Sequence, residues 1–219
     1  MVREGFIHRG TPPRPTGDAL KQLGITRFDE LVAHIDGLAD AGRKAGVDGQ
    51  AVQFVDLIRQ RLVRIHNYLT DQPAGAEPQA AIPAKAVRDT DDFMEQFGEI
   101  AEAARGAGLS TTITHYLHTA RLRIRFTLRG SGGRRIVSRD EKTGAAELSG
   151  PDGTLTVEVV DSSAYGVGVL AEQGIPTNTV VHLTTHEAER TRRYDCLVVY
   201  SEPHRFKYHL GLEIFAIRQ

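Results

Sequence analysis

Residues 130–139 read Gly-Ser-Gly-Gly-Arg-Arg-Ile-Val-Ser-Arg, and the pattern of the chain changes on either side of them. Downstream, short apolar runs are separated by turn residues, for example at 149–153 and 202–204, which is typical of antiparallel strands. The expected strands are residues 155–160, 166–170, 179–185, 194–200 and 206–217. Several short strands at this spacing predict a small antiparallel β-barrel.

Upstream of this stretch, apolar residues recur every three or four positions, as on the buried face of a helix. These stripes are at residues 28–38, 52–69 and 93–104. The third helix is expected to begin near Asp89 or Thr90, whose side-chain oxygens can cap free amides, and to end at Gly106. A short fourth helix is expected over 109–117. The 52–69 stripe either packs inside the protein or forms a self-association seam.

Residues 121–129 fit two structures. Leu122, Ile124, Phe126 and Leu128 alternate with polar residues, which is the two-residue period of a half-buried strand. Leu117, Ile124 and Leu128 also lie at helical spacing, so that the fourth helix could continue. Between these alternatives we favour the strand.

The predicted fold class is therefore α+β, with helices and strands segregated. A helical domain is expected over 1–120, with an irregular arm at 1–16 and an extended Pro/Ala connector at 72–88. The barrel and its leading arginine segment are expected over 121–219. Within it, residues 142–147 are a poor strand sequence although the first strand should lie there.

Composition limits the classes of function. A net charge of -1 argues against whole-protein attraction to nucleic acid or to an acidic membrane. Charge is instead local, since seven arginines and no Asp, Glu or Lys lie between Arg121 and Arg139. The single cysteine, Cys196, fits a reducing compartment, and we find neither a signal peptide nor a membrane-spanning run. We therefore expect a soluble, cytoplasmic protein.

Two motifs suggest a ligand site. Three arginines follow the glycine-rich break, and an Asp-x-Ser-x-x-Gly motif lies where a strand should end. The residues are Arg134, Arg135, Arg139, Asp161, Ser163 and Gly166. Guanidinium groups bind phosphates, and an Asp-x-Ser turn suits the hydrogen-bonding edge of a purine. A glycine at position 166 permits a backbone geometry or a close approach that a side chain would block.

From Arg134 to the end, the chain resembles a PilZ domain, the bacterial receptor module for cyclic di-GMP. The likeness rests on Arg134-Arg135-x-x-x-Arg139, on Asp161-x-Ser163-x-x-Gly166, and on a gap between them that holds one strand out and one back. The resemblance implies that Arg135 and Arg139 hold phosphate and one guanine edge. It also implies that Asp161 accepts from guanine, that Ser163 supplies a hydroxyl at the same turn, and that Arg134 stacks on a base or holds a second ligand molecule.

A cyclic di-GMP receptor is accordingly the first hypothesis, with the helical domain reporting the bound state to a protein partner or a second copy. The arginine segment would then dock on the barrel when ligand binds. A PilZ-like interaction module without nucleotide is the alternative, and RNA binding through residues 121–139 is a third reading. We find no catalytic constellation and expect no enzyme, no cofactor and no metal site.

Overall fold

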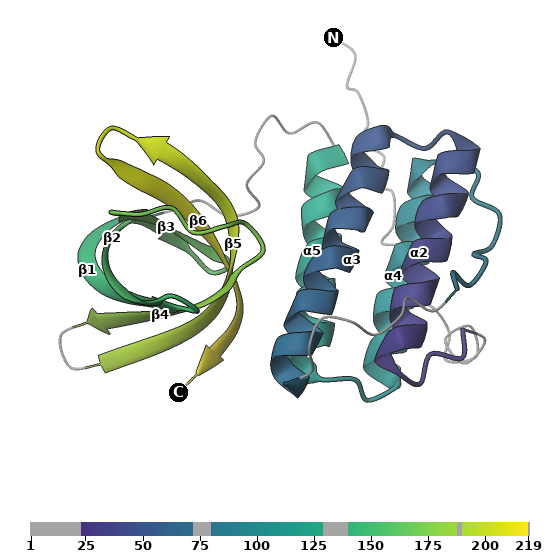
Figure 1. The fold of residues 1–219 in the computed structure, drawn as a ribbon. Helices are drawn as coiled ribbons and strands as arrows, with labels where there is room; N and C mark the ends of the chain where they lie inside the picture. Colours follow the sequence, from purple (N-terminus) through teal and green to yellow (C-terminus); the bar gives the residue numbers. More distant parts are fainter. Residues whose placement is uncertain (1–22, 72–79, 129–139, 188–189, 219) are drawn as a thin grey trace, which may run out of the picture.

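The computed structural model describes residues 23–71, 80–128, 140–187 and 190–218. Within them, four helices are followed by a closed six-stranded antiparallel barrel. Figure 1 shows the helices standing side by side on one flank of the barrel. The predicted α+β class with segregated halves is confirmed. No helix in these ranges is both long and apolar enough to span a membrane.

The helices form a four-membered bundle. They are α2 (Phe28–Ala45), α3 (Gly49–Thr70), α4 (Thr90–Gly106) and α5 (Thr111–Leu128). Contacts run from α2 to α3, α3 to α5, α5 to α4 and α4 back to α2. The helices α3 and α5 lie nearest to the barrel (Figure 1).

Local sequence signals explain the helix ends and faces. Asp89 caps α4 by accepting a hydrogen bond from the amide of Asp92 at 2.8 Å, as the sequence predicts. Gly46 ends α2 in the left-handed conformation, with φ of 68°. The 52–69 stripe is buried in the bundle from Val52 to Ile65, whereas Leu69 is 40% exposed. The stripe is therefore part of the core and not a self-association seam.

The strand favoured for residues 121–129 is wrong, because α5 continues without a break to Leu128. Ile113, Leu117 and Ile124 form one buried helical face against the other helices. The Arg121 guanidinium packs on α4 where Gly98 leaves room, since a β-carbon there would lie 2.6 Å from its Cζ. The apolar residues of this segment fit both the two-residue period of a strand and the spacing of a helix. Packing against the other helices of the bundle favours the helix.

Six strands close the barrel. They are β1 (Asp140–Gly150), β2 (Gly153–Ser163), β3 (Gly166–Ala171), β4 (Val180–Glu187), β5 (Arg190–His204) and β6 (Lys207–Arg218). Their order around the barrel is β1-β2-β3-β6-β5-β4, and β1 pairs with β4 to close it. Each expected strand is present, and one strand out and one back lie between Arg139 and Asp161, as the resemblance requires.

The unfavourable sequence at 142–147 nevertheless forms part of β1. From Gly144 to Gly150 this strand pairs with β2, and from Ala146 to Ser149 it also pairs with β4. Pairing on both sides satisfies its backbone groups, and Ala146 and Leu148 are buried in the barrel core. Tertiary pairing therefore outweighs weak local propensity.

Of the predicted connector, residues 80–88 run without regular secondary structure along α2. The amide of Ile82 donates to the carbonyl of Ala33 at 3.0 Å, and Gly37 gives the Ile82 carbonyl room that a β-carbon would fill. The arm at 1–16 and residues 72–79 lie outside the described residues.

Candidate ligand-binding face of the barrel

Asp161 and Ser163 lie at the end of β2, where a tight hairpin returns the chain into β3. The amide of Gly168 donates to Asp161 Oδ1 at 3.0 Å and orients the carboxylate. The Ser163 hydroxyl accepts from the amide of Tyr165 and donates to the carbonyl of Gly166, both at 3.3 Å. The motif thus forms one compact turn with two half-buried polar side chains.

Strand pairing arranges the motif in two neighbouring rows across four strands. One row is Ser163, Gly166, Glu213 and Leu197; the next is Asp161, Gly168, Gly211 and Tyr200. The residues between these rows, Val167 and Leu212, are buried in the barrel core. Because alternate residues of a strand point to opposite faces, both rows lie on the outer wall.

In the second row, only the two end positions, Asp161 and Tyr200, carry side chains. Gly168 and Gly211 separate Asp161 from Tyr200, and the Tyr200 ring leans over Gly211, whose β-carbon would lie 2.0 Å from Tyr200 Cε1. Gly166 is not among the described glycines with positive φ, and its residue is buried where β3 pairs with Glu213 of β6.

Arg134, Arg135 and Arg139 lie outside the described residues. The chain nevertheless enters the barrel beside the Asp-x-Ser turn, because Asp140 pairs with Ser162 and Glu141 pairs with Asp161. Arg139 is the residue bonded to Asp140. Strand pairing therefore puts Asp140 and Glu141, which directly follow Arg139 in sequence, beside the strand that carries Asp161 and Ser163.

The row that holds Ser163 and Gly166 continues into the junction with the helices. Glu213 accepts from Arg61 Nη1 of α3 at 2.5 Å, and these side chains are only 4% and 10% exposed. Burial alone would lower the pKa of Arg61, but Glu213 and Tyr116 of α5 outweigh it, so that the pKa is raised. The guanidinium is therefore charged, and it ties β6 to two helices.

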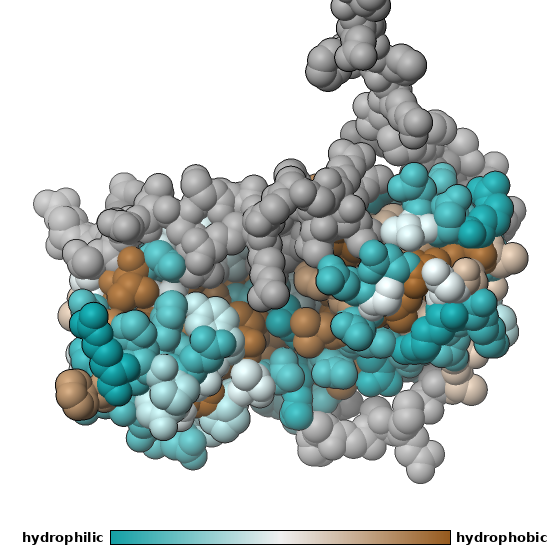
Figure 2. Space-filling view, turned by 90° about the horizontal axis from the view of Figure 1, so that it is seen from above, coloured by the Kyte–Doolittle hydropathy of each residue, from teal (hydrophilic) through white to brown (hydrophobic). Residues whose placement is uncertain are grey.

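Apolar packing completes this junction. Leu197 and Phe215 of the barrel are buried in the same core as the bundle, not in the barrel interior. Figure 2 shows apolar residues at the junction of the two halves, between largely hydrophilic flanks. The helical half is thus packed on the barrel wall that carries the candidate site.

A second polar cluster lies on β4, β5 and β6, facing the end of α3. The buried Asp195 carboxylate accepts from Arg218 Nε at 2.8 Å and lies 2.8 Å from His182 Nδ1. Arg218 also donates to the Tyr68 hydroxyl on α3. Every polar group named here has a protein partner, so the cluster holds the two halves together.

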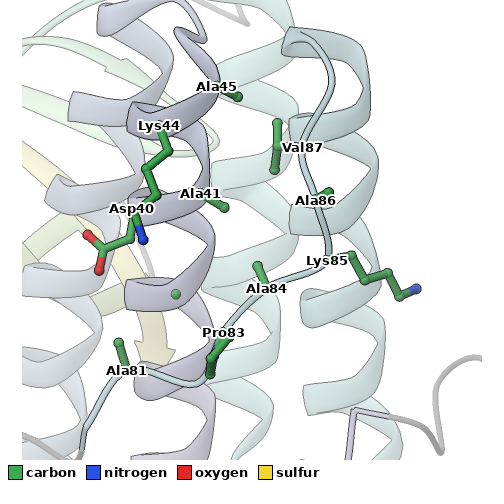
Figure 3. Close-up of a pocket in the computed structure, with 11 residues that line it drawn as sticks. Asp40, Ala41, Lys44, Ala45, Ala81, Pro83, Ala84, Lys85, Ala86 and Val87 are labelled. Atoms are coloured by element: carbon green, nitrogen blue, oxygen red, sulfur yellow. The ribbon is translucent and has the colours of Figure 1, made fainter.

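Three other features of the described residues lie apart from this motif. A groove between α2 and the connector is lined mainly by small and apolar residues (Figure 3). Its charged residues are Asp40 and Lys44 on α2 and Lys85 on the connector, and Lys85 pairs with Glu99. No group of three metal-ligating side chains occurs in the described ranges. Burial, then Asp195 and Glu213, raise the pKa of the Cys196 thiol far above its usual range. That side chain belongs to the core.

Sequence reasoning overlooked four residues of this face: Gly168, Gly211, Tyr200 and Glu213. Their roles depend on the register of strand pairing, in which β3 meets β6 more than 40 residues further along the chain, and no local pattern marks them. An isolated glycine within a strand, as at 211, is the one available signal of close approach.

No protein-family model matches this sequence, and no curated protein resembles it significantly. The geometry of the face therefore carries the functional argument.

Proposed function

We propose that this protein is a receptor for cyclic di-GMP, bound on the outer wall of a PilZ-like barrel. The observation that carries the proposal is the placement of Asp161 and Ser163 on one hairpin, beside Asp140 and Glu141, which directly follow Arg139 in sequence. A flat, anionic, base-containing ligand needs both a cation cluster and acceptors for the edge of its base.

The chemistry of each group fits one part of the ligand. Guanine N1–H and N2–H are adjacent donors, and the Asp161 carboxylate, already oriented by Gly168, accepts from them. Arg135 and Arg139 bind phosphate and the O6 and N7 edge, and Arg134 stacks on a base or serves a second molecule. A hydrogen bond to a charged group contributes about 1.5–3 kcal/mol, and micromolar affinity needs about 8 kcal/mol, so a few such contacts suffice.

In this proposal the helical half reports the bound state. Glu213 follows Gly211 by two residues on β6 and pairs with Gly166 in the site, while its carboxylate holds Arg61 of α3. The amide of Ile214 also donates to the carbonyl of Tyr165 in the turn. A shift of the turn on binding would therefore move the strand that α3 and α5 pack against, and so alter the surface offered to a protein partner or a second copy.

The alternative function is a PilZ-like interaction module that binds no nucleotide. One observation favours it: hydrogen bonds within the hairpin already engage Asp161 Oδ1 and the Ser163 hydroxyl. Both groups have a structural role that needs no ligand.

Isothermal titration with cyclic di-GMP near physiological salt separates these functions. We expect saturable binding at micromolar affinity or tighter in the full chain, and its loss in the double variant Arg135→Ala/Arg139→Ala. Arg105→Ala is the matched control, because this exposed arginine of α4 pairs only within its own helix. No binding by the wild type, or equal binding by the double variant, would overturn the receptor proposal.

A second experiment tests the pose. Asp161→Ala removes the acceptor for the guanine edge but leaves the phosphate clamp, so we expect weaker binding and a loss of preference over cyclic di-AMP. Unchanged selectivity would exclude Asp161 from the guanine contact. The RNA-binding reading predicts instead an affinity that falls steeply with salt and shows no guanine preference.

A further inference from the structure

Tyr200 and His209 form an aromatic pair on the outer wall of β5 and β6. Tyr200 Oη lies 3.2 Å from His209 Nε2, and the rings meet edge to face with centroids 5.2 Å apart. Both side chains are half-buried. The pair is held in place from below, because Gly211 lets the Tyr200 ring lie directly on the β6 backbone.

This pair occupies the far end of the row that begins at Asp161. Asp161, Gly168 and Gly211 are consecutive partners on β2, β3 and β6, and neighbouring strands are about 4.8 Å apart. The Tyr200 ring above Gly211 is therefore about two strand spacings, or roughly 10 Å, from the Asp161 backbone. The Asp161 carboxylate, which reaches the amide of Gly168, and the Tyr200 ring, which covers Gly211, therefore lie at the two ends of a pair of buried glycines. A dinucleotide held by one base at Asp161 has its other base within reach of the ring.

We propose that Tyr200, braced by His209, is a stacking wall for the second purine base of a cyclic dinucleotide, the base that Asp161 does not hold. The inference rests on the proposed function and deepens it. An aromatic ring accepts the π-face of any base, so Tyr200 contributes affinity with little base selectivity, while Asp161 selects guanine. The two ends of the row thus divide recognition between them.

The chemistry of the pair supports this role over a purely structural one. On the neighbouring strand β6, Leu210 and Leu212 point into the barrel core, and Phe215 packs against the helices. Tyr200 instead lies on the outer wall, and its hydroxyl is fixed by His209. A wall fixed before binding loses little side-chain entropy when a base stacks on it.

The test uses the full chain and two probes. One is cyclic di-GMP, and the other is the same dinucleotide with one guanine replaced by fluorescent 2-aminopurine. Because Asp161 retains the guanine, the 2-aminopurine is directed to Tyr200, and stacking quenches its fluorescence. Tyr200→Leu removes the ring, and Tyr200→Phe keeps the ring without the hydroxyl. Tyr208→Leu is the matched control, because Tyr208 on the same hairpin packs on Gly174 instead.

We expect wild type and Tyr208→Leu to quench the bound probe, Tyr200→Phe to quench it nearly as well, and Tyr200→Leu not to quench it at saturation. Affinity for cyclic di-GMP should fall about five- to a hundredfold in Tyr200→Leu. If that variant melts early, His209→Leu replaces it, with weaker quenching expected.

The contrary results separate failure of the stacking role from failure of the receptor function. Undiminished quenching in Tyr200→Leu, or in His209→Leu where that replaces it, with cyclic di-GMP still bound, overturns the stacking wall and leaves the receptor function standing. No binding of cyclic di-GMP by the wild type overturns both. If Tyr208→Leu loses as much quenching as Tyr200→Leu, the effect comes from a general disturbance of the hairpin. That result also overturns the proposed stacking role of Tyr200.

Discussion

The Arg61–Glu213 pair offers the sharpest test of how the two halves are joined. Replacing Glu213 by Gln keeps the shape of the side chain and removes its charge. The Arg61 guanidinium would then stay charged in a site where its side chain is 10% exposed, with Tyr116 as its remaining neighbour. An uncompensated buried charge is far more costly than the loss of one exposed ion pair.

The expected loss is large because both partners are buried. Removing one member of a buried ion pair costs about 3–5 kcal/mol, whereas exposed pairs contribute at most about 1 kcal/mol. With a urea m value of about 2 kcal/mol per molar, a loss of about 4 kcal/mol lowers the unfolding midpoint by about 2 M. Since the halves share one core, we expect a single transition and not two.

The assay is urea unfolding at pH 7 followed by circular dichroism. Glu158→Gln is the matched control, because Glu158 also lies on a barrel strand but pairs with Lys207 at 3.5 Å in an exposed position. Its midpoint should hardly change. The double variant Arg61→Met/Glu213→Leu should recover most of the loss, since it leaves no buried charge. A Glu213→Gln midpoint equal to that of Glu158→Gln would refute the reasoning.

Three further predictions follow from single contacts. Gly211→Ala should weaken cyclic di-GMP binding and displace the Tyr200 ring, seen as a shift of its NMR resonances, because the new β-carbon would lie 2.0 Å from Cε1. Cys196, buried and with a raised thiol pKa, should react with a thiol reagent only at the rate of unfolding, and fast labelling of the native chain would contradict this. Burial lowers the pKa of His66, stacked on Phe28, below 6.5. The folded protein therefore binds this proton less readily than the unfolded chain, and stability should be full above about pH 6.5 and decline as the pH falls through the folded pKa. His66→Gln should flatten that decline in unfolding free energy measured against pH.

Much of the fold could be predicted from the sequence, because its signals are local. The stripe from Val52 to Ile65 and the cap at Asp89 each act within a few residues, and both are confirmed. The strands from β2 to β6 are marked by turn residues and apolar runs. What failed was the choice at residues 121–128, where two periods coincide and only packing against Gly98 and its helix distinguishes them.

The candidate site was predictable only in part, for a similar reason. The turn at Asp161 and Ser163 is a local motif, and the structure brings its members together. Glu213 and Arg61 are 152 residues apart in sequence, and Tyr200 meets Gly211 only through the register of β5 on β6. Such pairings depend on the order of the strands and on β-bulges, and local sequence patterns do not reveal either of them.

The burial of Leu197 and Phe215 among the helices has a practical consequence for any attempt to produce the barrel on its own. Cutting the chain at Asp140 would expose both side chains on one wall and leave Glu213 facing water without Arg61. Such a fragment would expose an apolar patch, prone to aggregation, directly beside the proposed ligand face. The helical half thus shields one wall of the barrel from water, and a shortened protein would need to keep α3 and α5.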